Sequence, residues 1–163
     1  MHRHPWYYEM VAGDRVMGTV HLDEGVTITG IAGLMRVTSR DRVTTLWKPG
    51  ASGKDAMASY FVGNAGLFAK VKRVTLGDSR AGGFELDGNG WRGSWLIDTT
   101  SHERAVTFVA QGDPAVCYHI APAGQGAPLA VVMLAAYILL DREAHGWAVA
   151  TRLERRRRVG PHH

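Results

Sequence analysis

The stretch PLAVVMLAAYILL, at residues 128–140, decides how this chain folds, because it contains no charged residue and shows no polar face at helical spacing. A helix that is apolar all round must be enclosed on every side. This one would be about 20 Å long, well short of the roughly 30 Å hydrocarbon core of a bilayer. The stretch therefore predicts a helix buried inside the protein near residues 128–143, with Pro128 as its first helical residue.

Short runs typical of β-strands fill the chain before this helix. They combine β-branched and aromatic residues with period-two alternation, and Gly, Asn, Asp or Pro separates them. The expected strands are Trp6–Ala12, Val16–Leu22, Val26–Ala32, Leu34–Thr38, Val43–Trp47, Ala58–Gly63, Leu67–Leu76, Gly83–Asp87, Trp91–Asp98, Arg104–Ala110 and Ala115–Ala121. Their alternation is typical of an antiparallel wall with one dry and one wet side. Along Trp91–Asp98 it places Trp91, Trp95 and Ile97 on one face, expected to be the dry one, and Arg92, Ser94 and Asp98 on the other.

A barrel of about twelve strands is too wide for its own side chains to fill, since eight strands already enclose a side-chain-filled interior. The apolar helix supplies the missing filling. The sequence therefore predicts a mainly β fold, a closed antiparallel barrel of about twelve strands around one buried hydrophobic C-terminal helix. We expect a single domain over residues 1–154, followed by a basic flexible tail over residues 155–163.

The bulk composition is that of an ordinary globular protein of 163 residues, with 45% hydrophobic and 21% charged residues. The run Arg155–Arg158 accounts for the whole formal charge of +4. Such a run gives weak, salt-sensitive attraction to anionic membranes or nucleic acid and no sequence-specific reading. The single cysteine, Cys117, excludes an intramolecular disulfide and fits a reducing cytoplasm. With no secretory signal visible, we expect a cytoplasmic protein, peripheral at a membrane.

An apolar helix after about twelve short strands resembles the tubby C-terminal-like superfamily, which includes tubby domains, LURP-one-related proteins and phospholipid scramblases. The segment that carries the resemblance is APLAVVMLAAYILLDR, residues 127–142. Its apolar part is followed by the acidic Asp141, as in LURP-one-like helices. The resemblance implies a closed barrel around a central helix and, from tubby domains, phosphoinositide headgroups bound by basic residues on the barrel surface. The chain after Arg142 is longer than the family pattern.

Three basic residues of one expected strand are the candidate ligand-binding residues for an anionic headgroup: Lys70, Lys72 and Arg73. Lys70 and Lys72 share a face of that strand, with Ala69 and Val71 behind them. The alternative is a solvated barrel face. Further cations that are candidates to lie near them are Lys48, Lys54 and Arg92.

No motif predicts a catalytic residue, a metal site or a cofactor. The segment GASGK, residues 50–54, departs from the phosphate-binding loop at both ends, because Lys48 stands where glycine is required and Asp55 where serine or threonine is required. The eight histidines show no metal-ligand spacing.

The leading hypothesis is a non-enzymatic binding module for an anionic phospholipid headgroup, a membrane surface or a protein partner. The alternative is a small β-barrel enzyme whose site forms only in three dimensions. Asp98, His102 and Glu103 offer such an enzyme an acid–base pair, although their polar segment is typical of a solvated turn. An open lumen would favour the enzyme, and a lumen filled by the helix would count against it.

Overall fold

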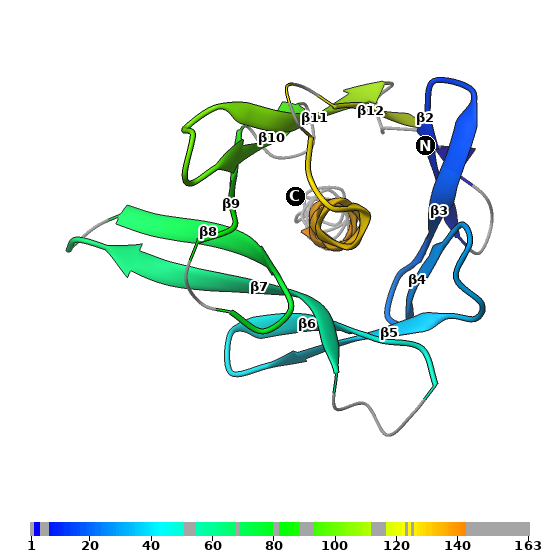
Figure 1. Cartoon of the computed structure of the whole chain (residues 1–163), viewed down its shortest axis with the longest axis horizontal. Helices are drawn as coiled ribbons and strands as arrows, with labels where there is room; N and C mark the ends of the chain where they lie inside the picture. Colours follow the sequence, from blue (N-terminus) through cyan, green and yellow to red (C-terminus); the bar gives the residue numbers. More distant parts are fainter. Residues whose placement is uncertain are drawn as a thin grey trace, which may run out of the picture.

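The chain forms a closed β-barrel around one helix, as the computed structural model shows (Figure 1). The structure describes residues 2–3, 7–50, 55–67, 69–79, 82–88, 93–111, 117–122, 124 and 126–142. The strands are β1 (His2–Arg3), β2 (Tyr8–Ala12), β3 (Arg15–His21), β4 (Gly25–Ile28), β5 (Met35–Arg40), β6 (Val43–Trp47), β7 (Ala56–Ala65), β8 (Ala69–Leu76), β9 (Phe84–Gly88), β10 (Gly93–Asp98), β11 (Arg104–Gln111) and β12 (Cys117–Pro122). The helix, called the central helix below, spans residues 129–142. The predicted fold class is confirmed.

The wall is an antiparallel meander in which each strand from β2 to β12 pairs with the next one along the chain. The short β1 closes it, because His2 pairs with Cys117 of β12 on one side and with Glu9 of β2 on the other. A direct parallel contact between β12 and β2, at His119 and Val11, completes the closure. Closure removes the free sheet edges that an open meander would leave at its two ends.

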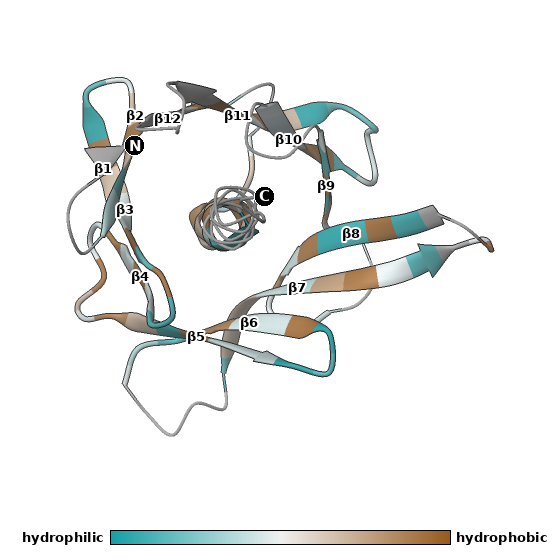
Figure 2. Cartoon of the chain, turned by 180° about the vertical axis from the view of Figure 1, so that it is seen from behind, coloured by the Kyte–Doolittle hydropathy of each residue, from teal (hydrophilic) through white to brown (hydrophobic). Residues whose placement is uncertain are grey.

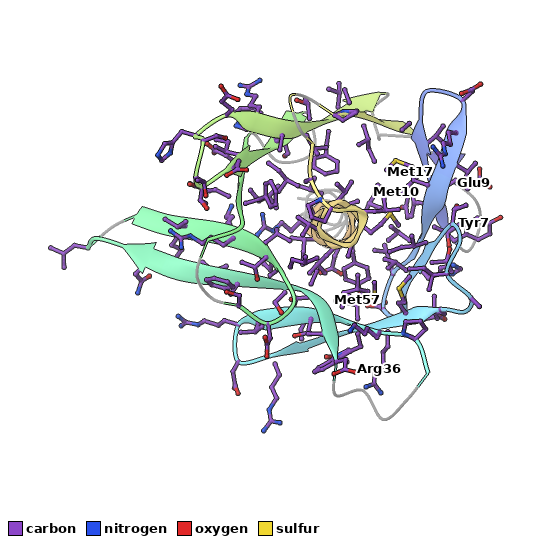
Figure 3. The ribbon with its side chains drawn as sticks, in the orientation of Figure 1. Tyr7, Glu9, Met10, Met17, Arg36 and Met57 are labelled. Atoms are coloured by element: carbon purple, nitrogen blue, oxygen red, sulfur yellow. The ribbon has the colours of Figure 1, made fainter. Side chains whose placement is uncertain are left out.

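Side chains alternate between the lumen and the outside of the wall. Met10 is fully buried and points from β2 toward the central helix, whereas Glu9 and Arg36 point away from it (Figure 3). Hydrophilic and hydrophobic residues also alternate along β8 (Figure 2), although at its outer end the hydrophilic Lys70 and Lys72 share the face of the buried Val74. The period of two that marks a half-buried strand in the sequence therefore separates the two faces of this wall.

The central helix fills the lumen. Every residue from Ala130 to Leu140 is 7% exposed or less, and Leu134 is fully buried. The helix begins one residue later than predicted. Pro128 precedes it and accepts, through its carbonyl oxygen, the N–H of Val132 at 3.1 Å. The predicted last residue, Glu143, lies outside the described residues, as do the end of the predicted domain and the whole predicted tail.

Two contacts fix the helix against the wall. Gly18 of β3 has its missing side chain on the lumen face, where a Cβ would lie 2.0 Å from the carbonyl oxygen of Thr27 and 3.1 Å from Met133 Cε. Farther along the helix, the hydroxyl of Tyr137 accepts the backbone N–H of Asp23 at 3.2 Å. Asp23 has a φ of 66°, a left-handed conformation that suits the β3–β4 turn.

One assignment of faces made from the sequence is wrong. Trp95 and Ile97 were expected on the dry side of their strand, opposite Ser94. In the structure Ser94 and Leu96 are buried, with exposed fractions of 2% and 0%, and Trp95 is half-buried on the other face. The Arg104 guanidinium lies 4.0 Å from the centre of the Trp95 ring. A cation stacked on the ring covers an aromatic side chain outside the barrel.

Candidate functional site

The β7–β8 hairpin extends beyond both neighbouring strands (Figure 1). Pairing of β6 with β7 reaches Phe61, and pairing of β9 with β8 reaches Arg73. The pairing between β7 and β8 continues past these points to Ala65 and Ala69. Residues 62–67 and 69–72 therefore belong to a two-stranded projection from the wall, called the projecting ribbon below.

The two candidate lysines stand on the lumen-side face of this hairpin. Val74 of β8 is fully buried in the lumen. Since side chains two residues apart share a face, Lys72 and Lys70 continue that face outward along the ribbon. Lys72 is half-buried and Lys70 is exposed, because the wall that would cover them stops before they do.

Arg142, at the last described position of the central helix, reaches the same corner of the barrel. Its Nη2 donates a hydrogen bond to the hydroxyl of Tyr60, and its guanidinium lies 5.5 Å from the centre of that ring. Tyr60 is on β7, where it pairs with Val74 across the hairpin, and it is only 6% exposed. The packing of helix against barrel thus places a third cation beside the lysine face.

The electrostatics of Lys72 reflect this convergence. Burial lowers the pKa of Lys72, and the neighbouring Arg142 lowers it further. Asp87 acts in the opposite direction, and Lys70 adds to the lowering. Burial also raises the pKa of Tyr60, against which Arg142 acts, so the phenol stays protonated near neutral pH. The site, called the basic corner below, consists of the three cations Lys70, Lys72 and Arg142. Tyr60 holds Arg142 in place.

The third candidate residue, Arg73, is not part of the basic corner. It has the opposite side-chain direction from Lys72 and pairs across the strands with Glu85 of β9. Opposite charges directly across a strand pair stabilise a sheet modestly. Arg73 is therefore a residue of the outer wall face.

The other cations proposed as neighbours do not join the basic corner. Lys48 follows β6 and its N–H donates to the carbonyl oxygen of Asp55 at 2.9 Å. This contact lies just before β7 begins, whereas Lys70 pairs with Asn64 close to where β7 ends. The two positions are about 30 Å apart along an extended strand. Lys54 and Arg92 lie outside the described residues.

Sequence reasoning missed Arg142 and Tyr60. Arg142 was assigned to the end of the buried helix, and Tyr60 to a wall strand. One signal was available, since Arg142 is the first cation after the apolar run. Its neighbours depend on how deeply the helix enters the barrel, which no local pattern of residues specifies.

The residues of the acid–base alternative, Asp98, His102 and Glu103, lie at the turn between β10 and β11. Asp98 Oδ1 accepts the backbone N–H groups of Thr100 and Ser101 at 2.7 and 3.3 Å. His102 is exposed, with a φ of 59°. The backbone carbonyl oxygen of Glu103 accepts a hydrogen bond from the N–H of Asp98 at 2.9 Å. These contacts hold the β10–β11 connection together, as expected for a solvated turn, and the filled lumen counts against a site inside the barrel.

The described residues contain no group of three or more histidine, cysteine, aspartate or glutamate side chains placed to hold a metal ion. Within the same part of the chain, no helix is both long and apolar enough to cross a membrane. Three hollows in the described structure have other linings. One of about 380 Å³ between β6 and β7 has Asp78 as its charged lining residue, and one of about 290 Å³ has Arg15. The third, of about 320 Å³ at the β10–β11 connection, is lined by the charged residues Asp98, Glu103 and Arg104.

Comparison with known proteins gives no relative: the chain matches no protein-family model, no curated protein and no solved structure. The functional argument therefore rests on the geometry of the basic corner.

Proposed function

We propose that this protein is a non-enzymatic binding module whose basic corner recognises the phosphate-bearing headgroup of an anionic phospholipid. The observation that carries the proposal is the convergence of Lys70, Lys72 and Arg142, which come from a projecting hairpin and from the central helix. Like charges held together disfavour one another's protonation. An anion bound among them removes that repulsion.

The chemistry of the basic corner suits a phosphate group. Arg142 presents a planar guanidinium, and the two lysines present compact charges on flexible stems. Tyr60 holds the guanidinium through its hydroxyl and ring. A donor already positioned loses less conformational entropy when it binds a ligand than a free side chain does.

The resemblance to the tubby C-terminal-like superfamily supports the same proposal from a separate direction. It implies headgroup binding by basic residues of the barrel, and a closed barrel around a central helix is compatible with it. Under this proposal the protein acts at the surface of an anionic membrane, peripherally and from the cytoplasmic side. Partner proteins at that membrane are compatible with it.

The test is co-sedimentation with vesicles of phosphatidylcholine containing a phosphoinositide, using a chain that lacks residues 155–163. Removing the arginine tail leaves the basic corner as the cation cluster under test. Each basic residue near an anionic surface contributes about 1 kcal/mol. The double variant Lys70→Ala, Lys72→Ala should therefore weaken binding about 30-fold.

The matched control is Arg73→Ala, which removes one cation from the same strand but from the outer face. Its binding should stay within about twofold of the parent. The single variant Lys72→Ala, which also removes one cation, is the direct comparison. Equal losses of binding from Arg73→Ala and Lys72→Ala would mean that general charge, and not the basic corner, drives association. No sedimentation of the tailless parent at low salt would refute the proposed function.

A further inference from the structure

The projecting ribbon ends in an exposed apolar side chain. Leu67, in the turn between β7 and β8, is 94% exposed. Single exposed leucines are common on protein surfaces, so the argument depends on where this one lies. It occupies the outermost part of the hairpin, which Figure 1 shows extending away from the rest of the barrel.

The ribbon has no acidic residue. None occurs anywhere between Asp55 and Asp78, and the ribbon itself carries the two lysines Lys70 and Lys72. Its composition therefore combines an apolar end with positive charge directly behind it. This is the combination that binds the interface of an anionic bilayer, where apolar side chains enter the acyl boundary and cations remain among the headgroups.

The dimensions of the ribbon match those of that interface. Lys70 belongs to the pair next to the last one of the hairpin, and Lys72 stands about 7 Å behind it. The headgroup layer on each side of the hydrocarbon core is about 5–8 Å thick. With Leu67 at the acyl boundary, Lys70 lies within the headgroup layer and Lys72 near its outer surface.

We propose that the β7–β8 hairpin is the membrane-insertion element of this protein, with Leu67 entering an anionic bilayer while Lys70 and Lys72 contact its headgroups. This inference rests on the proposed function and adds the source of the ligand, which is a headgroup within a bilayer and not a free phosphate compound. It also orients the protein, because the hairpin must point toward the membrane.

A second copy of the chain is the other occupant to consider, since the ribbon presents backbone edges that neither β6 nor β9 covers. Antiparallel pairing of two β8 edges would place lysines of one copy opposite lysines of the other, which is destabilising. Charge complementarity therefore favours the anionic bilayer.

The experiment compares two ligands for each variant of the tailless chain. Soluble inositol hexakisphosphate, measured by calorimetric titration, tests the basic corner without a bilayer. Vesicles of phosphatidylcholine with 30% phosphatidylserine, measured by co-sedimentation, test the bilayer. Leu67→Asp should lower vesicle partitioning about tenfold or more and leave affinity for the inositol phosphate unchanged. Leu34→Asp, at a 44% exposed loop position, is the matched control and should leave both unchanged.

The outcomes separate the two proposals. Equal vesicle partitioning by Leu67→Asp and the parent would overturn the insertion inference and leave the proposed function standing. A parent that binds neither the inositol phosphate nor the vesicles would overturn both the proposed function and the insertion inference. Thermal unfolding of Leu67→Asp at the parental temperature confirms that the variant is folded.

A probe at the tip gives an independent readout. A nitrobenzoxadiazole label on Leu67→Cys, in a chain whose Cys117 is replaced by serine, should brighten and shift to the blue on adding anionic vesicles. Lipids carrying a quencher in the acyl chain should quench it. The same spectral change without vesicles, rising with protein concentration, would assign the tip to contact between copies and overturn the inference.

Discussion

Truncation of Leu134 to alanine measures how tightly the barrel encloses its helix. Leu134 is fully buried and lies at the middle of the central helix. Buried Leu→Ala substitutions cost about 2.7–5.0 kcal/mol, and the cost rises with the volume of cavity that the surroundings cannot fill. Because a closed hydrogen-bonded wall has little freedom to collapse inward, we expect the upper part of that range, about 3.5–5 kcal/mol.

The measurement is urea unfolding followed by far-ultraviolet circular dichroism, with the free energy taken from the midpoint and slope. For a domain of this size the same loss should lower Tm by about 7–20 °C. Leu139→Ala, at 4% exposure, should fall in the same class. Leu67→Ala is the control with identical chemistry at an exposed site, and should change stability by less than about 0.5 kcal/mol.

A difference of less than about 1 kcal/mol between Leu134→Ala and Leu67→Ala would refute the reasoning. It would mean that the lumen adjusts freely around the helix, or that the helix leaves the lumen in solution. A reduced slope without a shifted midpoint would instead indicate a change in compactness and not the loss of packing argued here.

Three further predictions follow from the wall and the basic corner. Lys72→Met should raise Tm at pH 7 and increase the free energy of unfolding by less than about 1 kcal/mol. The pKa of Lys72 is lowered in the fold, so its charged form is destabilising. The gain should shrink above about pH 10, where unprotonated lysine carries no such penalty, and circular dichroism melts at the two pH values check this. Gly18→Ala should destabilise the barrel by about 1–3 kcal/mol through its contacts with the opposing strand and the helix, whereas Gly93→Ala, with no atom within 4 Å of the added Cβ, should not. Tyr137→Phe should cost about 1 kcal/mol in urea unfolding, because it removes the acceptor of the Asp23 N–H. No change in that variant would mean that water replaces the hydroxyl.

The barrel could be predicted because two local sequence patterns specify it: an uninterrupted apolar run for the helix and period-two alternation for the strands. The apolar run at residues 128–140 has no wet face, which leaves enclosure as its physical solution, and strand alternation marks the wall around it. The segment Val43–Trp47 was predicted with the bounds observed for β6. The two-residue β1 was missed, because His2 and Arg3 have no apolar periodicity and pair with strands distant in the sequence.

The basic corner could be predicted only in part. Lys70 and Lys72 were placed on one face correctly, but that face continues the lumen side of the wall. Lysine is inferred to face outward because burying its charge is costly. A lysine does not identify the outer face here, because the hairpin extends beyond β6 and β9 and both faces of the projecting ribbon contact solvent. Arg73 was grouped with the lysines because it follows Lys72 in the sequence. Adjacent residues of a strand point to opposite faces, so Arg73 and Lys72 lie on different sides of the hairpin.

The order of the elements along the chain has a consequence for synthesis. The twelve strands precede the central helix, so the ribosome releases the wall before it makes the segment that fills it. Hairpins between successive strands can form early, because their contacts are local. The lumen faces of those strands, including Met10, Met35 and Leu96, meet their helical partner only after residue 140 has emerged. Until then the nascent wall exposes apolar strands, a state prone to aggregation. The final cooperative step of folding therefore waits for the central helix, and chains that stop before residue 129 should be substrates for chaperones or proteases.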